Sequence, residues 1–358
     1  MDNGINQQRR RFFGSAAAAV AVTQFGLAGS ASAQPQAAAA GSSSNAGLAG
    51  SGSRFSAAAP SFGTLKQIDA GLLSVGYVEV GPAGGAPVIL VHGWPYDIHA
   101  FAEVAPALAA RGYRVIVPYL RGHGTTRFLS DATVRNGQQA AISLDILALM
   151  DALRIPKAIL GGFDWGARAV CVIAALWPER VKGLVSVSGY LVINVNNGGT
   201  PLKPSAEHQW WYQYYLATER GVAGYAKYTR DFAKFIWQTA SPQWQFDDAT
   251  LDRSAAAFAN PDHVAIVVHN YRWRQAAAAG EARYDELERR LAAGPAITVP
   301  SITMEAEANG APFPQPASYR AKFTGKYEHR DLGNGVGHNL PQEAPQAFVQ
   351  ALLDVAAM

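Results

Sequence analysis

Short apolar runs alternate with amphipathic stretches along much of the chain. Continuous apolar runs are typical of strands buried on both faces of a parallel sheet. They lie at residues 87–91, 113–117, 157–161 and 181–187, and a more alternating strand pattern covers residues 72–80. Helical spacing fills the intervals at residues 101–110, 140–153 and 166–177. This order predicts a mostly parallel α/β sheet with right-handed crossovers and helices on both faces.

The alternation breaks after residue 189. Residues 190–296 are aromatic, charged and largely helical in spacing, without a clear buried strand. Strand patterns resume at residues 298–304 and 327–332, and a closing helix is expected over residues 343–357. The pattern predicts one sheet in two parts, residues 63–189 and 297–358, with a helical cap (lid) of residues 190–296 inserted between them.

The first 62 residues have a different character. Arg9, Arg10 and Arg11 precede two phenylalanines, a mild apolar stretch follows at residues 15–29, and Ala31-Ser32-Ala33 offers a cleavage site. This order resembles a twin-arginine export signal. We therefore expect a signal peptide at residues 1–33, a flexible Ala/Gly/Ser-rich linker at residues 34–62, and a periplasmic or secreted protein. The apolar stretch is too short for a spanning helix, so no stable membrane insertion is expected.

Composition narrows the classes of function. Of the 358 residues 49% are hydrophobic and 16% are charged, which is typical of a packed globular protein. Thirty Lys and Arg against 27 Asp and Glu give a net charge of +3 without a clustered basic run that would indicate a nucleic-acid partner. The single cysteine, Cys171, cannot form an internal disulfide or a cysteine-rich zinc site, and is expected to be a small buried residue.

The sharpest motif is Gly162-Phe163-Asp164-Trp165-Gly166, which lies between a predicted strand and a predicted helix. A G-x-nucleophile-x-G turn in that position is a nucleophile elbow. Asp164 stands where many such elbows have serine, and a carboxylate attacks carbon to form an ester to the enzyme. Hydrolysis of that ester needs a base and an oxyanion hole. The backbone N–H groups of Trp94 and Trp165 are the candidate oxyanion donors.

The base is expected far downstream. His338 lies in a glycine-flanked loop before the closing helix, so that the order nucleophile, acid, histidine is that of α/β-hydrolases. The acid should follow the strand at residues 298–304, where Glu307 or Asn309 could hydrogen-bond the imidazole. We favour Glu307, because only a carboxylate would also stabilise the imidazolium.

Together these motifs resemble the epoxide hydrolase and haloalkane/haloacetate dehalogenase branch of the α/β-hydrolase superfamily, over about residues 65–358. The resemblance rests on His92-Gly93-Trp94-Pro95, the Asp164 elbow, and Gly337-His338 before Pro341. It implies an α/β-hydrolase fold and no metal or organic cofactor. It also places the triad acid at Asn309, where the family usually has Asp. Tyr212 and Tyr271 match the two cap phenols with which epoxide hydrolases bind the epoxide oxygen.

Two alternative functions are also consistent with these residues. A hydrolytic dehalogenase would use the same Asp164, and Arg168 matches a second arginine of the haloacetate type. A non-catalytic binding protein of the same fold would explain the irregular acid loop. A serine esterase is disfavoured because the elbow lacks serine. For the leading reading we expect a small, apolar substrate that contacts Trp211 and Arg168; the sequence does not set an oligomeric state.

Overall fold

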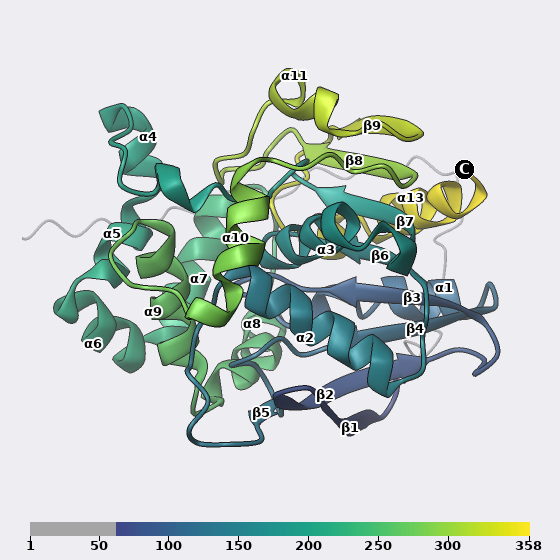
Figure 1. The fold of residues 1–358 in the computed structure, drawn as a ribbon, viewed down its shortest axis with the longest axis horizontal. Coiled ribbons are helices and arrows are strands. Elements are labelled where there is room, and N and C mark those ends of the chain that lie inside the picture. The colour runs from purple at the N-terminus through teal and green to yellow at the C-terminus, as the bar shows by residue number, and fades with distance from the viewer. Residues whose placement is uncertain (1–61) are drawn as a thin grey trace, which may run out of the picture. The chain divides into compact units, whose positions relative to one another are not determined.

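The computed structural model describes residues 62–358; the expected signal peptide and all of the expected linker except Phe62 lie outside the described residues. The strands are β1 (Leu65–Ala70), β2 (Leu73–Val80), β3 (Ala86–Val91), β4 (Tyr113–Pro118), β5 (Arg127–Phe128), β6 (Ala158–Gly162), β7 (Val181–Val187), β8 (Ser301–Ala306) and β9 (Tyr327–Leu332). They form a nine-stranded sheet in the order β1-β2-β4-β3-β6-β7-β8-β9, with β5 beside β2 (Figure 1). From β4 to β9 neighbouring strands are parallel, and β1 and β2 form an antiparallel edge, which confirms the predicted fold class.

The strand β3 shows why its sequence is apolar throughout. Val88 and Leu90 point to one face, where they share a hydrophobic cluster with α1 (Val104–Ala109) and α13 (Pro345–Ala357). Ile89 and Val91 point to the other face, where α2 (Gln139–Ala152) and α3 (Trp165–Leu176) cover the sheet. Because helices lie on both faces, the four residues from Val88 to Val91 are fully buried, and a continuous apolar run results.

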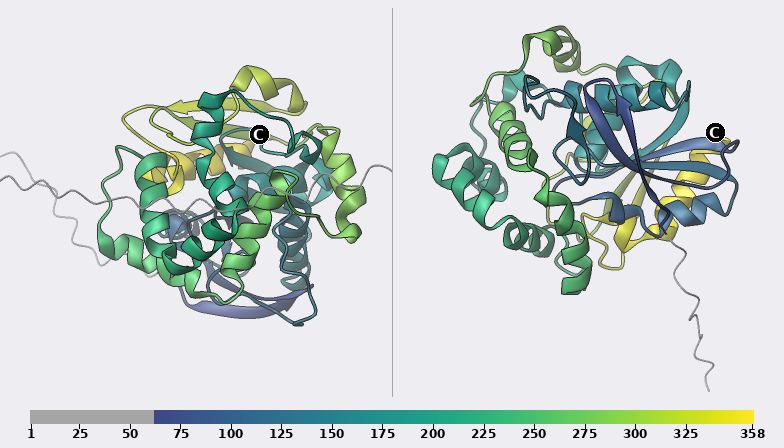
Figure 2. Two further views of the ribbon diagram at one scale, coloured as in Figure 1. Left: turned by 90° about the vertical axis from the view of Figure 1, so that its left-hand side faces the viewer. Right: turned by 90° about the horizontal axis from the view of Figure 1, so that it is seen from below.

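A helical insertion joins β7 to β8. It contains α4 (Pro204–Gln209), α5 (Trp211–Ala217), α6 (Glu219–Lys227), α7 (Thr229–Ala240), α8 (Asp248–Ala255), α9 (His263–Arg274) and α10 (Asp285–Ala292). Most of these helices lie together on one side of the sheet (Figure 2). The insertion therefore occupies the stretch in which the sequence pattern loses its strands.

Three predicted elements differ from the structure by more than one residue at a boundary. The helix expected over residues 101–110 is shorter, because α1 begins at Val104. The strand expected over residues 298–304 is β8, which begins at Ser301. The closing helix is divided into α12 (Leu340–Glu343) and α13, and α13 begins at Pro345, a residue suited to the first turn of a helix and not to its interior. A short helix, α11 (Pro316–Tyr319), precedes β9.

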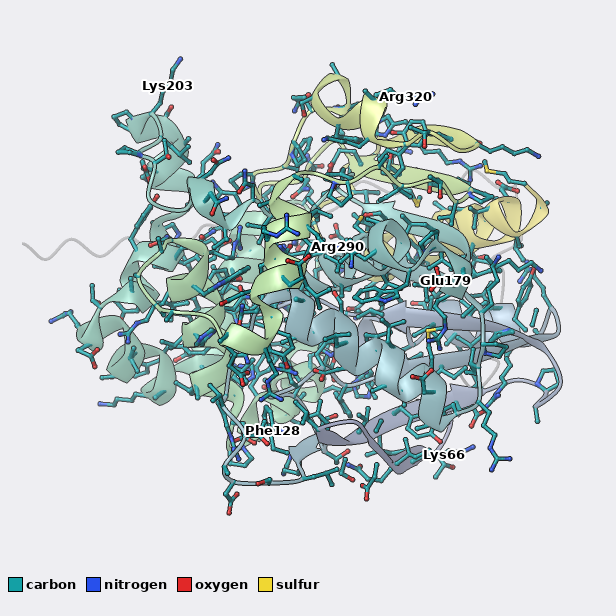
Figure 3. The ribbon with its side chains drawn as sticks, viewed as in Figure 1. Lys66, Phe128, Glu179, Lys203, Arg290 and Arg320 are labelled. Carbon is teal, nitrogen blue, oxygen red and sulfur yellow. The ribbon has the colours of Figure 1, made fainter. Side chains whose placement is uncertain are left out.

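Charged side chains are spread over the surface of the described part. The labelled basic residues Lys66, Lys203, Arg290 and Arg320 come from four separate segments of the fold (Figure 3). Within residues 62–358 no helix has the length and apolar character needed to cross a membrane.

One ion pair is buried in the core. Arg121, which follows β4, donates from Nε to Asp145 Oδ2 at 2.6 Å and from Nη2 to Asp145 Oδ1 at 2.7 Å. The guanidinium also donates to the carbonyl oxygen of Asn136 at 2.8 Å. This bidentate contact joins the loop after β4 to α2, and removing one partner would leave a charge without compensation in the interior.

We expect Asp145→Ala to lower the free energy of unfolding by about 3–5 kcal/mol, because Arg121 would stay buried and unpaired. Asp151→Ala is the matched control: Asp151 lies on the same helix and pairs with Arg180, but its side chain is 67% exposed. Its loss should cost about 0–1 kcal/mol. Urea unfolding of both variants tests this, and equal losses would contradict it.

Candidate active site

The turn between β6 and α3 presents Asp164. Its backbone has φ +52° and ψ −121°, a conformation that L-residues rarely adopt. A Cβ on Gly166 would lie 1.8 Å from the carbonyl oxygen of Val91, and one on Gly162 would lie 2.6 Å from the carbonyl carbon of Gly166. The turn is thus too tight for side chains at either glycine, and a sharp strand-to-helix turn lies where the sequence predicts one.

The Asp164 carboxylate has two different neighbours. Its Oδ1 accepts a hydrogen bond from the backbone N–H of Trp94 at 2.7 Å. Its Oδ2 lies 3.7 Å from Nε2 of His338, and the carboxylate side chain is 20% exposed. Burial by itself would raise the pKa of Asp164, but the neighbouring His338 imidazole, the charge of Arg168 and the Trp94 N–H together hold it below its usual value. Asp164 is therefore an ionised, accessible carboxylate.

The second expected oxyanion donor stands beside the first. Trp165 is the first residue of α3, where helix N–H groups lack partners within the helix and the helix dipole favours negative charge. Gly93 lets the loop of Trp94 approach, since a Cβ there would lie 2.4 Å from Cβ of Asp164. Of the two expected donors, the Trp94 N–H contacts the carboxylate directly, and the Trp165 N–H belongs to the residue that follows Asp164 at the start of α3.

A chain of hydrogen bonds fastens the Trp94 loop to the insertion. The indole Nε1 of Trp94 donates to the hydroxyl of Tyr225 on α6 at 2.8 Å. That hydroxyl contacts Nε2 of His263 on α9 at 2.8 Å, and Nδ1 of His263 faces the carbonyl oxygen of Gly122 at 2.8 Å. A carbonyl only accepts, so His263 donates from Nδ1 and accepts at Nε2. Burial lowers the pKa of His263 to about 4, so this ring stays neutral near pH 7.

His92 holds the same loop from within the core. Its Nδ1 donates to the carbonyl oxygen of Gly93 at 2.9 Å, and its Nε2 accepts from the N–H of Leu120 at 3.2 Å. Burial lowers the pKa of His92, in keeping with a neutral ring that accepts at one nitrogen. His92 therefore supports the loop and does not contact the cavity described below.

The expected base, His338, has Asn309 as its partner. Nδ1 of His338 lies 3.1 Å from Oδ1 of Asn309. Glu307, which the sequence analysis favoured, is exposed and makes no hydrogen bond to His338 in the described chain. That preference is wrong in this structure: Glu307 follows the end of β8 with its side chain in solvent, and the chain turns back toward the imidazole only at Asn309.

A carboxylate that the sequence analysis did not select lies behind Asn309. Glu305, the fifth residue of β8, accepts at Oε1 from Nδ2 of Asn309 at 2.9 Å and from the N–H of Ala306 at 2.9 Å. It is 6% exposed. Its sequence signal was an acidic residue inside a strand of otherwise apolar or small neighbours, which is unusual unless the charge has a partner.

The His338 loop is held from two sides. The carboxylate of Glu343 on α12 accepts from the N–H of Gly337 at 2.7 Å, from the N–H of Asn339 at 3.0 Å and from the hydroxyl of Ser241 at 2.6 Å. Ser241, which ends α7 of the insertion, accepts in turn from the N–H of His338 at 2.9 Å. The position of the imidazole thus depends on core and insertion together.

Two phenols from the insertion gather near Asp164. Tyr212 on α5 stacks on Trp94 with ring centroids 5.5 Å apart, and Tyr271 on α9 meets Tyr212 edge to face at 5.3 Å. The indole Nε1 of Trp165 donates to the Tyr271 hydroxyl at 3.2 Å. Burial, with the Asp164 charge nearby, raises the pKa of Tyr212 to about 12 and that of Tyr271 well above its usual value. Both phenols therefore keep their protons at neutral pH and can donate.

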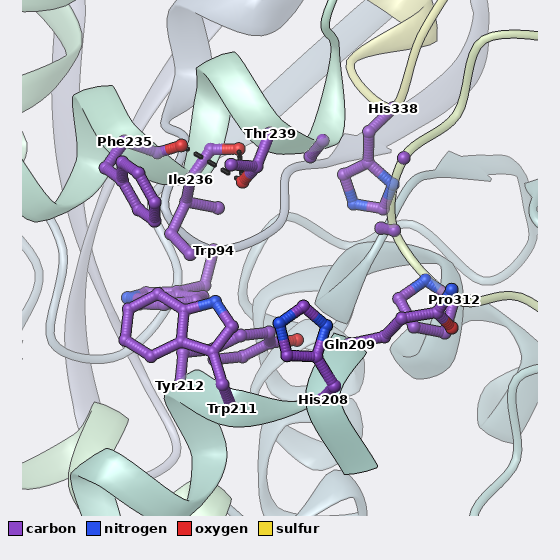
Figure 4. Close-up of a pocket in the computed structure, with 13 residues that line it drawn as sticks. Trp94, His208, Gln209, Trp211, Tyr212, Phe235, Ile236, Thr239, Pro312 and His338 are labelled. Atoms are coloured by element: carbon purple, nitrogen blue, oxygen red, sulfur yellow. Dashed lines mark hydrogen bonds between the residues drawn. The ribbon is translucent and has the colours of Figure 1, made fainter. Parts of the chain in front are cut away.

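A cavity of about 610 Å³ opens beside these residues, with Trp94 and His338, both partners of Asp164, in its wall (Figure 4). Trp211, Phe235 and Ile236 supply apolar surface. Trp211, one of the expected substrate contacts, lies on α5 next to Tyr212 and faces the cavity (Figure 4). A mostly apolar wall with a few polar groups is typical of a small-molecule site.

The other expected substrate contact, Arg168, lies in the first turn of α3 and is 7% exposed. Nε and Nη1 of its guanidinium are buried and have no hydrogen-bond partner in the part of the chain that the structure describes. Burial first, and then the charge of Arg274, lower its pKa to about 10, so the group stays cationic. A buried cation with open donors near Asp164 could receive an anion.

No cluster of three or more His, Cys, Asp or Glu side chains that could hold a metal occurs between residues 62 and 358. Cys171 is buried, as expected, with its sulfur 3.3 Å from the Ser186 hydroxyl.

Comparison with known proteins shows which family this chain resembles. The family model described as alpha/beta hydrolase fold matches residues 86–261. An epoxide hydrolase of Caballeronia sordidicola is 30% identical over 126 residues, which are 35% of this chain and 38% of the relative. A haloalkane dehalogenase of Mycobacterium marinum is 32% identical over 142 residues, which are 38% of this chain and 44% of the relative. The chain therefore spans only about two fifths of the curated relatives it matches.

Solved structures extend the similarity. A crystal structure of a provisionally named epoxide hydrolase from Klebsiella pneumoniae is 63% identical, with a TM-score of 0.83, and the match covers 84% of this chain and all of that one. A similarly named protein from Pseudomonas aeruginosa shares the fold, with a TM-score of 0.68 at 22% identity over 82% of this chain and 95% of that one. The chain belongs to the α/β-hydrolase family, in its epoxide hydrolase branch.

Proposed function

We propose that this protein is an epoxide hydrolase that opens an epoxide to a diol through an ester to Asp164. The observation that carries the proposal is the meeting of five groups: an ionised carboxylate on the elbow, an imidazole 3.7 Å from it, a backbone N–H on its Oδ1, and two protonated phenols from the insertion. The names of the relatives support the epoxide among the substrates this chemistry allows.

The contacts of Asp164 divide the roles of its two oxygens. Oδ1 is already held by the Trp94 N–H, so Oδ2 is the oxygen free to attack an epoxide carbon. As the C–Oδ2 bond forms, the epoxide C–O bond breaks, and the oxygen released takes a proton from Tyr212 or Tyr271. Oδ1 becomes the ester carbonyl oxygen, and it then lies at a donor that is in place before the reaction.

Ester hydrolysis depends on His338 and the two expected oxyanion donors. Nε2 of His338 takes a proton from water, and the hydroxide adds to the ester carbon while the N–H groups of Trp94 and Trp165 stabilise the oxyanion. The intermediate collapses, the diol oxygen leaves with the proton of the imidazolium, and the carboxylic acid of Asp164 returns its proton to the phenoxide. The sum is one epoxide and one water consumed and one diol formed.

A hydrolytic dehalogenase is the second candidate, and one observation favours it. The open guanidinium of Arg168 lies buried near Asp164, where it could bind the carboxylate of a short haloacid. The first step would again be attack by Asp164, with halide as the leaving group. Tyr212 and Tyr271 favour the epoxide, because halide does not need a proton.

The place of action remains a proposal from the sequence. The arginines and apolar stretch of residues 1–33 support export through a twin-arginine pathway to the periplasm or beyond. A fold without disulfides suits that route, since its passengers are exported folded.

A single turnover in heavy-oxygen water tests the ester route. Because Asp164 would regain one oxygen from water during hydrolysis, we expect the label in the peptide that carries Asp164 and not in the peptide of the buried carboxylate Asp145. Mass spectrometry of both peptides after one turnover measures this. Turnover without label in Asp164 would rule out the ester, and binding without turnover by the wild type would favour a binding protein.

Removing the phenols should slow ester formation and spare its hydrolysis. We expect Tyr212→Phe and Tyr271→Phe each to lower the rate of ester formation by about 10- to 100-fold, since each deletes one donor to the developing alkoxide, and the double variant to lose more. Tyr214→Phe, an exposed tyrosine on the same helix, is the control. Rapid-quench measurements of ester formation separate this result from loss of folding, which would slow both steps.

Substrate panels separate the two candidates. Neutral epoxides should yield diol, and chloroacetate and chloroalkanes should release no halide above the uncatalysed rate. Diol and halide are measured separately at equal enzyme concentration. Halide release from chloroacetate that disappears in Arg168→Met, with no diol from any epoxide, would reverse the assignment.

A further inference from the structure

The amide of Asn309 has one orientation in this structure. Its Oδ1 lies 3.0 Å from the N–H of Ala311, which can only donate, and its Nδ2 lies 2.9 Å from Oε1 of Glu305. Exchange of the amide oxygen and nitrogen would place two donors together at Ala311 and would set an oxygen against the Glu305 carboxylate. Both neighbours therefore specify the same orientation.

This orientation determines the form of the imidazole. Oδ1 of Asn309 is an acceptor 3.1 Å from Nδ1 of His338, so Nδ1 must carry a proton. Nε2 of the neutral ring is then bare, and it is the nitrogen that faces Asp164. A base that is to take a proton from water at Nε2 needs this tautomer.

Asn309 itself brings no charge to the site. When His338 takes a proton from water, the imidazolium needs a negative partner beyond the amide. Glu305 is such a partner: it has no Lys or Arg neighbour within hydrogen-bond or salt-bridge distance in the described chain, although it is buried. Burial raises the pKa of Glu305, while the hydrogen bonds from Asn309 and Ala306 and the charge of His338 act in the opposite direction.

We propose that Glu305 is a positioning residue for the reaction, acting on His338 through Asn309. The carboxylate holds the amide of Asn309, the amide holds Nδ1–H of His338, and the charge of Glu305 stabilises the imidazolium across the amide. The usual acid of the triad is thus divided here between a neutral residue in contact with the ring and a carboxylate one step farther away. This inference rests on the proposed role of His338 as base.

The substitution Glu305→Gln separates charge from shape. Both contacts of Glu305 go to Oε1, and the amide oxygen of glutamine can accept both. We expect this variant to hydrolyse the Asp164 ester about tenfold more slowly while forming it at the wild-type rate, so that ester accumulates. Glu307→Gln removes an exposed carboxylate two residues away and is the matched control, with no change in either rate.

Repeating the Glu305→Gln substitution in an Asn309→Asp variant tests whether its effect depends on charge. In Asn309→Asp the new carboxylate would touch His338 directly, but Glu305 would lie beside it, and two adjacent carboxylates must share a proton. Adding Glu305→Gln to Asn309→Asp should therefore speed ester hydrolysis, whereas the same change slows it beside asparagine. A Glu305 that served only for packing would have the same sign of effect in both backgrounds, and that outcome would overturn the proposal.

The tautomer of His338 can be determined by NMR without any substrate. Nitrogen NMR of labelled protein should show His338 protonated at Nδ1 in the wild type and in Glu305→Gln. In Glu305→Leu only the Ala311 N–H still specifies the orientation of the Asn309 amide, so we expect a share of the other tautomer. Thermal unfolding of each variant confirms that it folds. If the wild type shows the single tautomer but forms no ester with any epoxide, the proposed function is wrong, while the coupling of Glu305 to His338 through Asn309 stands. If Glu305→Gln hydrolyses the ester at the wild-type rate, the proposed role of Glu305 alone is wrong.

Discussion

The close approach of three backbone segments at the end of β6 is the constraint on which the site depends. Gly166 lies directly against the carbonyl oxygen of Val91, so the first turn of α3 begins in contact with the end of β3. That contact brings the Trp94 N–H to the carboxylate of Asp164, the residue directly before α3. Donors held by backbone need no rearrangement when charge develops, which is what an oxyanion site requires.

Much of the fold could be predicted because burial on both faces leaves a plain signal. Strands such as β3 read as unbroken apolar runs, and the Asp164 elbow was recognisable from two glycines at fixed spacing. The edge strand β1 and the short β5 gave no such pattern, since β1 is largely exposed and β5 has two residues. Boundaries moved by two or three residues at α1, β8 and α13, and only α13 begins at a proline.

The acid loop shows where sequence reasoning ends. Charge chemistry favoured Glu307 over Asn309, and that argument was sound for a residue in contact with the ring. It failed because the contact with the imidazole depends on where the chain places each side chain and not only on residue type. The side chain of Glu307 is exposed to solvent, and the chain turns back to the imidazole at Asn309. The carboxylate was present after all, two residues before Glu307 and inside the strand. The networks through Tyr225 and Ser241 join segments far apart in sequence, and local patterns do not show them.

The bond between Ser241 and Glu343 limits how this enzyme can be recombined with its relatives. One partner belongs to the inserted helices and the other to the last part of the sheet domain, yet both hold the same histidine loop. A chimera that receives a foreign insertion without a hydroxyl in this place would keep Asp164 and its tight turn but lose the hydrogen bonds that hold the backbone around His338. An insertion taken from a relative must therefore supply a hydroxyl at the position of Ser241, in addition to a pocket of suitable shape.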